Sequence, residues 1–265
     1  MIKCSVQDSD ALLNYIGTDY DKCAYLYIDF KKYGLENENV EMWKQLDTEG
    51  NIRIIALRYY NGMHLFSKEN VFDATDVKAL IETVRPSLVC GMKETLSRFE
   101  NQIQGYTYEY GKVLKLGSYS GIANPEVHRA NREDLKDIVE LLMTDEEMGG
   151  PYTFDLLYKQ YCERFDDGFG RSWVRKDEKG VVSHCATYAE LDDLAVISGG
   201  IVRMDYRGTG QYPGQLGAMC KDLYEEGKCV ISYYYGGAKS AHKAVGFEIL
   251  GDWEKLILCE ENTNE

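Results

Sequence analysis

The stretch MDYRGTGQYPGQL, residues 204–216, joins a run rich in β-branched residues to a segment with the apolar spacing of a helix. Gly208 and Gly210 permit backbone angles that turn neighbouring amide N–H groups toward one point. The positive end of the following helix lies at the same place, with Pro213 in its first turn. The stretch therefore predicts a loop that binds an anion such as a pyrophosphate.

Two familiar phosphate motifs do not fit this chain. The dinucleotide fingerprint would use Gly208 and Gly210 and then meets Pro213 in place of its third glycine. A Walker loop needs Gly-Lys-Ser, and residues 238–240 read AKS without either glycine. The loop at 207–210 must be interpreted from its neighbours.

The second half of the chain alternates helical and extended patterns around this loop. Asn131 can cap a helix whose apolar residues share one face, and Lys179-Gly180 and Asp192-Asp193 mark turns. The pattern predicts helices at 131–143, 153–165 and 213–227, strands at 171–177, 181–190, 194–204, 229–235 and 248–258, and a short helical segment near 240–245.

The first half shows a similar alternation. Asn61-Gly62 between two apolar runs predicts a β-hairpin. A helix over 73–84 has Asp73 or Thr75 as its cap, and Arg85-Pro86 ends it. A strand at 87–91, a helix at 93–103 and a strand at 106–116 follow, which predicts an α/β unit.

A chain of 265 residues is longer than the usual single domain. The periodicity lapses into small residues at 117–125, so we place a boundary there. The expected domains are residues 1–120 and 125–265.

Composition limits the partners. A formal charge of −14 argues against nucleic acid and favours cationic or amine substrates. The eight cysteines show no metal-ligand spacing, so we predict no metal site and reduced thiols in the cytoplasm. No apolar run approaches a membrane span, and the first residues lack the pattern of a secretory signal.

Residues 127–265 resemble the GNAT superfamily of N-acyltransferases. The resemblance lies in Val202 followed by Arg207-Gly208-Thr209-Gly210, in Gly246-Phe247 before the last strand, and in the order of the elements. It implies an α+β domain with a mixed, mostly antiparallel sheet flanked by helices. The first half can be a degenerate copy of the same fold, as in tandem GNAT proteins.

The resemblance also implies acetyl-CoA as cofactor. The family bends its fourth strand, and Gly199-Gly200 suits such a bulge. By position, the backbone of Ile201, Val202 and Arg203 would pair with the pantetheine arm. The expected pyrophosphate cradle comprises Arg207, Gly208, Thr209, Gly210, Gln211, Tyr212 and Gly214.

Two residues depart from the family pattern. Tyr212 stands where the family has a small residue close to the pyrophosphate, and His242 stands where the family often has a tyrosine that protonates the thiolate. A histidine can donate that proton, so we expect His242 to be the general acid. The alternatives are a surface histidine without a role, or Tyr233, Tyr234 or Tyr235 as the donor.

Glu190 is the expected general base, because it ends a strand beside further carboxylates at the mouth where the family places acidic residues. Alternation along that strand makes His184 and Cys185 face opposite sides. The predicted function is transfer of an acetyl group to the primary amine of a small molecule or an amino terminus. The alternative is an acyl-CoA-binding regulatory or scaffolding module without catalysis.

Overall fold

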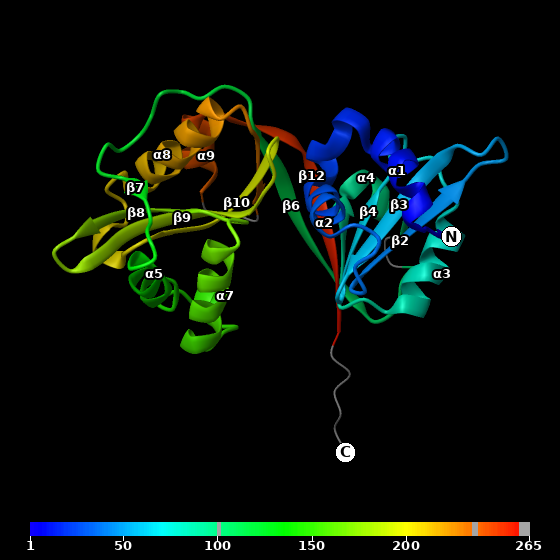
Figure 1. The fold of residues 1–265 in the computed structure, drawn as a ribbon, viewed down its shortest axis with the longest axis horizontal. Coiled ribbons are helices and arrows are strands. Elements are labelled where there is room, and N and C mark those ends of the chain that lie inside the picture. The colour runs from blue at the N-terminus through cyan, green and yellow to red at the C-terminus, as the bar shows by residue number, and fades with distance from the viewer. Residues whose placement is uncertain (100–101, 235–237, 260–265) are drawn as a thin grey trace, which may run out of the picture. The chain divides into compact units, whose positions relative to one another are not determined.

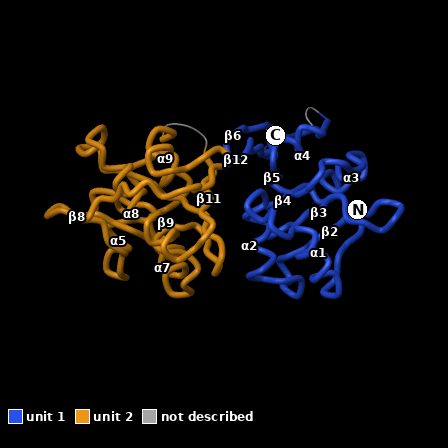
Figure 2. Tube along the Cα trace, turned by 90° about the horizontal axis from the view of Figure 1, so that it is seen from above, with its two compact units in different colours: residues 1–113, 250–265 blue, residues 114–249 orange. Residues whose placement is uncertain are grey.

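The computed structural model describes residues 1–99, 102–234 and 238–259. The chain divides into two compact units (Figure 2): unit 1 is Met1–Val113 with Leu250–Glu265, and unit 2 is Leu114–Ile249. The sequence placed the last strand wholly in the second domain. In the structure, strands β6 (Tyr106–Leu116) and β12 (Phe247–Leu258) each begin in one unit and end in the other.

Unit 1 contains a sheet with strand order β1-β2-β3-β4-β5-β12. The β4–β5 pair is parallel, and the pairs β1–β2, β2–β3, β3–β4 and β5–β12 are antiparallel. Its elements are β1 (Ile2–Lys3), α1 (Ser9–Ile16), α2 (Ala24–Tyr33), β2 (Val40–Leu46), β3 (Ile52–Tyr59), β4 (Gly62–Phe66), α3 (Ala74–Val84), β5 (Leu88–Met92) and α4 (Lys93–Leu96).

Local signals account for several boundaries of unit 1. Tyr59 pairs with Gly62, so the hairpin loop consists of Tyr60 and Asn61, one residue earlier than the Asn-Gly signal suggested. The Asp73 carboxylate caps α3 by accepting a hydrogen bond from the Thr75 amide. The helix predicted at 93–103 is shorter: α4 passes into a 3-10 turn at Ser97–Phe99.

Unit 2 has the strand order β6-β11-β10-β9-β8-β7. The β10–β11 pair is parallel, and β7–β8, β8–β9 and β9–β10 are antiparallel. Its elements are β7 (His128–Arg129), α5 (Asp134–Leu142), α6 (Glu146–Gly149), α7 (Phe154–Asp166), β8 (Ser172–Asp177), β9 (Gly180–Glu190), β10 (Leu194–Val202), α8 (Gln211–Glu225), β11 (Cys229–Tyr234) and α9 (Lys239–Val245).

Helices cover both faces of the unit 2 sheet. Figure 1 shows α8 and α9 on one face and α5 and α7 on the other. Cys185 packs in the apolar cluster under α8, whereas its neighbour His184 lies against Tyr161 of α7. The opposite orientation of these two side chains is as the alternation predicted. Both faces of β9 and β10 are therefore buried.

The two units repeat one order of elements: strand, two main helices, three strands, helix, strand, helix, strand. Each repeat contains one parallel pair, β4–β5 or β10–β11, next to antiparallel neighbours. The last strand of the second repeat, β12, pairs with β5 of the first, for example Trp253 with Met92. The structure thus contains two copies of one α+β fold, as the sequence suggested. None of the described helices is both long and apolar enough to cross a membrane.

Residues 117–124, expected to be a linker, instead pack along α8 and α9, and we call this segment the strap. The amide of Asn124 donates to the carbonyl of Gly214, and the amide of Ser120 donates to that of Val245. A Cβ on Gly217 would overlap the Ile122 carbonyl oxygen. The absence of a side chain at Gly217 therefore lets the strap lie directly on the helix.

Gly217→Ala should destabilise the protein although alanine is the better helix former. The gain in helix propensity is about 1 kcal/mol, whereas forcing a methyl group against backbone costs about 1–3 kcal/mol and displaces the strap. We expect a net loss of about 1 kcal/mol in urea unfolding, the middle of the resulting range. Lys221→Ala, on the exposed side of α8, is the control and should change stability by less than about 0.5 kcal/mol. Equal stability of Gly217→Ala and the parent would contradict the contact.

Candidate functional site

Strands β10 and β11 part in the middle of unit 2. Their parallel pairing runs from Leu194 with Cys229 to Ile197 with Ser232. Immediately afterwards the β9–β10 register shifts between Ser198 and Ile201, so the bulge expected at Gly199-Gly200 is present. We call the place beyond Ile197 and Ser232 the β10–β11 split.

Aromatic rings on both faces explain the two glycines at the bulge. Gly199 has φ +64, and a Cβ there would lie 3.1 Å from Cε1 of His184. A Cβ on Gly200 would lie 2.5 Å from the Tyr212 hydroxyl oxygen on the opposite face. Side chains at these positions would push the rings away, so glycine allows β10 to pass between them.

The loop before α8 is open. Gly208 and Gly210 have φ +79 and +80, and no atom lies within 4 Å of a Cβ placed on either. In the part of the chain that the structure describes, neither amide has a hydrogen-bond acceptor. These amides stand at the N-terminus of the 15-residue helix α8. The geometry suits an anion with several oxygens.

Other residues predicted for the cradle hold the loop in place. Arg207 Nε donates to the Val202 carbonyl at 3.0 Å, and Thr209 Oγ1 donates to the Tyr206 carbonyl. Arg203 forms ion pairs with Asp177 and Asp205. Arg207 Nη2 also lies 3.4 Å from the Asp145 carboxylate. Both arginines therefore have acidic partners, and the free groups of the loop are backbone amides.

The predicted residues of α8 point in different directions. Gln211 Oε1 accepts a hydrogen bond from the strap residue Asn124, and a Cβ on Gly214 would lie 2.9 Å from that of Asn124. Tyr212 instead turns inward, onto Gly200. Its ring also meets that of His242 edge to face, with centroids 6.2 Å apart. The phenol thus stands across the β10–β11 split, and burial raises its pKa far above the usual value.

His242 is buried beneath Tyr212. Its Nδ1–H donates to the Ala238 carbonyl at 3.0 Å, and its Nε2 accepts from the Ser232 hydroxyl at 3.2 Å. Burial lowers the pKa of the imidazole, with the Ala238 carbonyl opposing that shift. The ring is therefore neutral near pH 7, and the carbonyl fixes its tautomer. Sequence reasoning missed Ser232, because no local pattern distinguishes it from other strand serines.

Tyr234 also lies beside the split. Its ring is 5.8 Å from that of His242, and its hydroxyl oxygen accepts a hydrogen bond from the Lys239 amide at 3.2 Å. Its phenolic proton is thus available to another acceptor. Tyr235 lies outside the described residues.

Glu190 lies elsewhere in unit 2. It pairs with Ala195 near the start of β10, before the split begins. Its two carboxylate oxygens accept from Arg171 Nε and Nη2 at 2.7 and 2.8 Å, and Thr187 donates to the first of them at 2.6 Å. The structure therefore brings His242, Tyr234 and Tyr212 together and leaves Glu190 in an ion-pair network.

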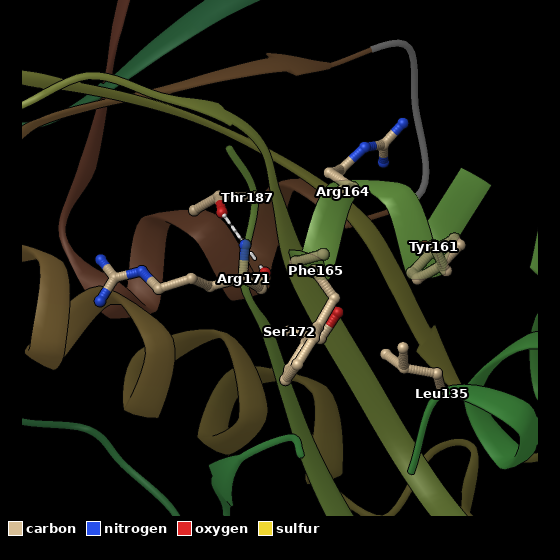
Figure 3. Close-up of a pocket in the computed structure, with 9 residues that line it drawn as sticks. Leu135, Tyr161, Arg164, Phe165, Arg171, Ser172 and Thr187 are labelled. Carbon is tan, nitrogen blue, oxygen red and sulfur yellow. Dashed lines mark hydrogen bonds between the residues drawn. The ribbon is translucent and has the colours of Figure 1, made fainter. Parts of the chain in front are cut away.

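A depression opens on the opposite face, under α7 (Figure 3). Its lining includes Tyr161, Arg164, Ser172 and Thr187. The Tyr161 hydroxyl would lie 3.4 Å from a Cβ on Gly199. The Arg164 guanidinium stacks on Tyr161 and on exposed Tyr188, and no carboxylate pairs with it in the described residues. The depression thus adjoins the bulge from the side away from Tyr212.

Unit 1 differs at the place that corresponds to the β10–β11 split and the loop before α8. Strands β4 and β5 are parallel as far as His64 and Cys90, but the next helix, α3, already carries the Asp73 carboxylate at its N-terminus. That negative charge occupies the position where an anion would bind. Across the residues described in both units, no group of three His, Cys, Asp or Glu could hold a metal ion.

No protein-family model matches the sequence, and no curated protein matches it. Solved structures do match the fold. A GCN5-related N-acetyltransferase from Sphaerobacter thermophilus has a TM-score of 0.61 at 15% identity, covering 96% of this chain and 93% of its own. A GNAT-family acetyltransferase from Colwellia psychrerythraea has a TM-score of 0.59 at 12% identity, with coverage of 93% and 97%.

Unit 2, with its parted strands and its glycine loop, therefore has the GNAT fold. A tandem GNAT protein from the clavulanic acid biosynthesis pathway matches with a TM-score of 0.59 at 10% identity and covers 96% of both chains. The whole chain thus has the tandem GNAT architecture, with the glycine loop in its second copy.

His184 gives the protein a specific acid sensitivity. Burial lowers its pKa to about 4 from 6.5, and its Nδ1–H donates to the Gly199 carbonyl at 2.7 Å. Between these pH values the unfolded state binds more protons, so this residue makes stability fall as pH decreases from 6.5 to 4. The loss should reach about 3 kcal/mol.

Urea unfolding of the parent and of His184→Gln at several pH values measures this effect. The parent should lose its stability advantage over His184→Gln as the pH falls from 6.5 to about 4. A constant difference between His184→Gln and the parent across this pH range would rule out the assigned protonation.

Proposed function

We propose that unit 2 binds acetyl-CoA and transfers its acetyl group to the primary amine of a small molecule or an amino terminus. The observation that carries this proposal is the open loop at Gly208 and Gly210, with unpartnered amides, directly beside the β10–β11 split. The loop fits a pyrophosphate as it stands. The split accepts a pantetheine arm when the Tyr212 ring turns out of it.

The position of Tyr212 has an energetic consequence. Moving a buried aromatic ring into water costs roughly 2 kcal/mol, and binding that requires this movement is weakened by about 30-fold. That cost is compatible with a working cofactor site, because coenzyme A offers many other contacts. Only a ligand that enters the split has to displace the ring, so this cost weakens the binding of acyl donors and not that of anions that bind the loop alone.

We assign proton transfer to the residues beside the split. Neutral His242 can accept a proton at Nε2, and the Tyr234 hydroxyl can donate one. We assign Glu190 a structural role, because Arg171 and Thr187 bind its carboxylate. The backbone at Ile201 is the proposed partner of the pantetheine arm, since Arg207 already binds the Val202 carbonyl.

The acceptor amine would approach from the depression under α7. Arg164 lies there as a guanidinium stacked on tyrosines, which leaves its N–H edge available to a carboxylate. The guanidinium would bind the carboxylate of an acceptor that carries one besides its amine. The reaction would take place in the cytoplasm, where the free cysteines stay reduced.

The second candidate function is acyl-CoA binding without catalysis. The inward Tyr212 ring and the two occupied nitrogens of His242 favour it. Release of free thiol from acetyl-CoA across a panel of amines separates the two functions. Binding without thiol release would support the non-catalytic module.

Acetyl-CoA should raise the melting temperature of the protein. At about 100 times its dissociation constant, a ligand adds about 2.7 kcal/mol. Gly208→Asp should abolish the shift, because a carboxylate would repel the pyrophosphate. Gly168→Asp is the matched control: both glycines have positive φ and open surroundings, so their backbone strain is similar. A parent protein without any shift at millimolar acetyl-CoA would refute the cofactor assignment.

Tyr212→Gly should bind acetyl-CoA about 10- to 100-fold more tightly than the parent, because the ring no longer has to leave the split. Tyr212→Phe keeps the ring and should bind as the parent does. Isothermal titration of the three proteins measures the dissociation constants. Weaker binding by Tyr212→Gly would mean that the ring contacts the cofactor instead of obstructing it.

A further inference from the structure

We propose that the acceptor is a free amino acid, whose carboxylate binds Arg164 and whose amine binds the Tyr161 hydroxyl in the depression under α7. This inference rests on the proposed function for the acetyl donor and names the acceptor of the same site. The two contacts themselves rest on the geometry of unit 2, where both side chains come from one helix and line one depression (Figure 3).

Arg164 has stacking partners but no carboxylate in the part of the chain that the structure describes. Its guanidinium carbon lies 5.7 Å from the ring centre of Tyr161 and 4.8 Å from that of Tyr188. Arginines elsewhere in unit 2 combine a stacked ring with a bound carboxylate: Arg171, Arg175 and Arg203. The guanidinium of Arg164 therefore has its N–H edge available for the two oxygens of a ligand carboxylate.

The Tyr161 hydroxyl lies beside the bulge and has no hydrogen-bond partner among the described residues. A Cβ on Gly199 would lie 3.4 Å from its oxygen. The Gly199 carbonyl accepts its hydrogen bond from His184 Nδ1–H, at 2.7 Å, instead of from the phenol. Burial raises the pKa of Tyr161 to about 12. The hydroxyl is therefore neutral near pH 7, and its oxygen can accept a hydrogen bond from an amine.

The position of Tyr161 places the amine next to the proposed thioester. Gly199 is two residues from Ile201, the proposed backbone partner of the pantetheine arm, so their Cα atoms are at most about 7 Å apart. An amine bound to the Tyr161 hydroxyl lies on the α7 face of this short segment. Arg164 follows Tyr161 by about one helical turn. A carboxylate on Arg164 is therefore one turn of α7 away from the reacting nitrogen.

The spacing of the two contacts favours an amino acid over other amines. Side chains three residues apart on a helix have Cβ atoms about 5–6 Å apart, and a free amino acid carries its carboxylate within a few ångströms of its nitrogen. In an amino terminus a neutral amide replaces that carboxylate. A diamine would bring a second positive charge to Arg164, and none of the described residues that line the depression is acidic.

The bound amine reacts by direct attack on the thioester. Its nitrogen forms a bond to the acetyl carbon, the C–S bond breaks, and the electron pair of that bond stays on sulfur. One proton of the amine is transferred to the thiolate, so the products are an N-acetyl amino acid and free coenzyme A. The Tyr161 oxygen accepts a hydrogen bond from the neutral amine, which orients the nitrogen lone pair toward the carbonyl.

Acceptors that differ in the carboxylate test the role of Arg164. The best of the free amino acids is compared with its methyl ester and with the amine that lacks the carboxyl group. The free acid should have the lowest KM, by about 10-fold or more. In Arg164→Gln the KM of the free acid should rise by about 10- to 100-fold, whereas that of the ester stays within about twofold.

Lys159→Gln is the control for this comparison. It removes a positive charge from an exposed position of the same helix, and it should change neither KM. Equal KM values for the free acid and its ester in the parent protein would overturn the carboxylate contact. A similar rise of both KM values in Arg164→Gln would also overturn it, because a structural effect does not depend on the carboxylate of the acceptor.

Tyr161→Phe tests the amine contact, because it removes the hydroxyl and keeps the ring on which Arg164 stacks. The kcat/KM of the free acid and that of its ester should both fall by about 5-fold or more, while the dissociation constant of acetyl-CoA stays as in the parent. Tyr158→Phe, whose ring stacks on Phe154 and does not line the depression, is the control. An unchanged kcat/KM in Tyr161→Phe would overturn the contact.

Binding of the acceptor without acetyl-CoA separates this inference from the proposed function. Melting-temperature shifts screen the free amino acids, with and without coenzyme A, and isothermal titration of the best one should give about 10-fold weaker binding in Arg164→Gln. If acetyl-CoA neither binds nor reacts, the proposed function fails, but this Arg164-dependent binding still supports the two contacts. If amines without a carboxylate are acetylated as fast as free amino acids, the inference fails and the proposed function stands. Failure of every free amino acid to bind would overturn the inference.

Discussion

The parting of β10 from β11 is the constraint on which the site of unit 2 depends. Parallel strands that stay paired expose no backbone between them, whereas here the pairing ends at Ile197 and Ser232. Gly199 and Gly200 make the bend possible because His184 and Tyr212 press on the strand from opposite faces. The glycine loop before α8 follows β10, and α9 follows β11, so both come directly after the strands that part.

Local sequence signals were sufficient for the architecture of unit 2 and for the loop. Glycines at 199, 208 and 210 have positive φ, and such requirements are visible in the residue type itself. The direction of Tyr212 and the Ser232–His242 contact were not predictable, because they depend on residues 10 to 30 positions apart meeting across three elements. The ion pair of Glu190 was not predictable for the same reason, because its partner Arg171 lies on another segment.

The two repeats keep one fold and differ at the N-terminus of the helix that follows their third main strand. Both repeats retain the parallel pair and the helix that follows it. In unit 1 the helix begins with Asp73, whose carboxylate satisfies the Thr75 amide. A cap of this kind stabilises a helix by about 1 kcal/mol. In unit 2 the N-cap residue of α8 is Gly210, which has no side chain that could accept a hydrogen bond from the helix amides. Helix α8 therefore lacks the stabilisation of a side-chain cap, and the amides of its loop stay open.

Tyr212 and His242, the two departures from the family pattern, are in contact and form a single structural change. The Tyr212 ring packs edge to face against the His242 imidazole, with centroids 6.2 Å apart. The Nε2 atom of the same imidazole lies 3.2 Å from the Ser232 hydroxyl oxygen of β11. The two residues therefore connect α8 to β11 at the place where β10 and β11 part. A substitution at Tyr212 or at His242 therefore changes both the packing beside the split and the surroundings of the imidazole.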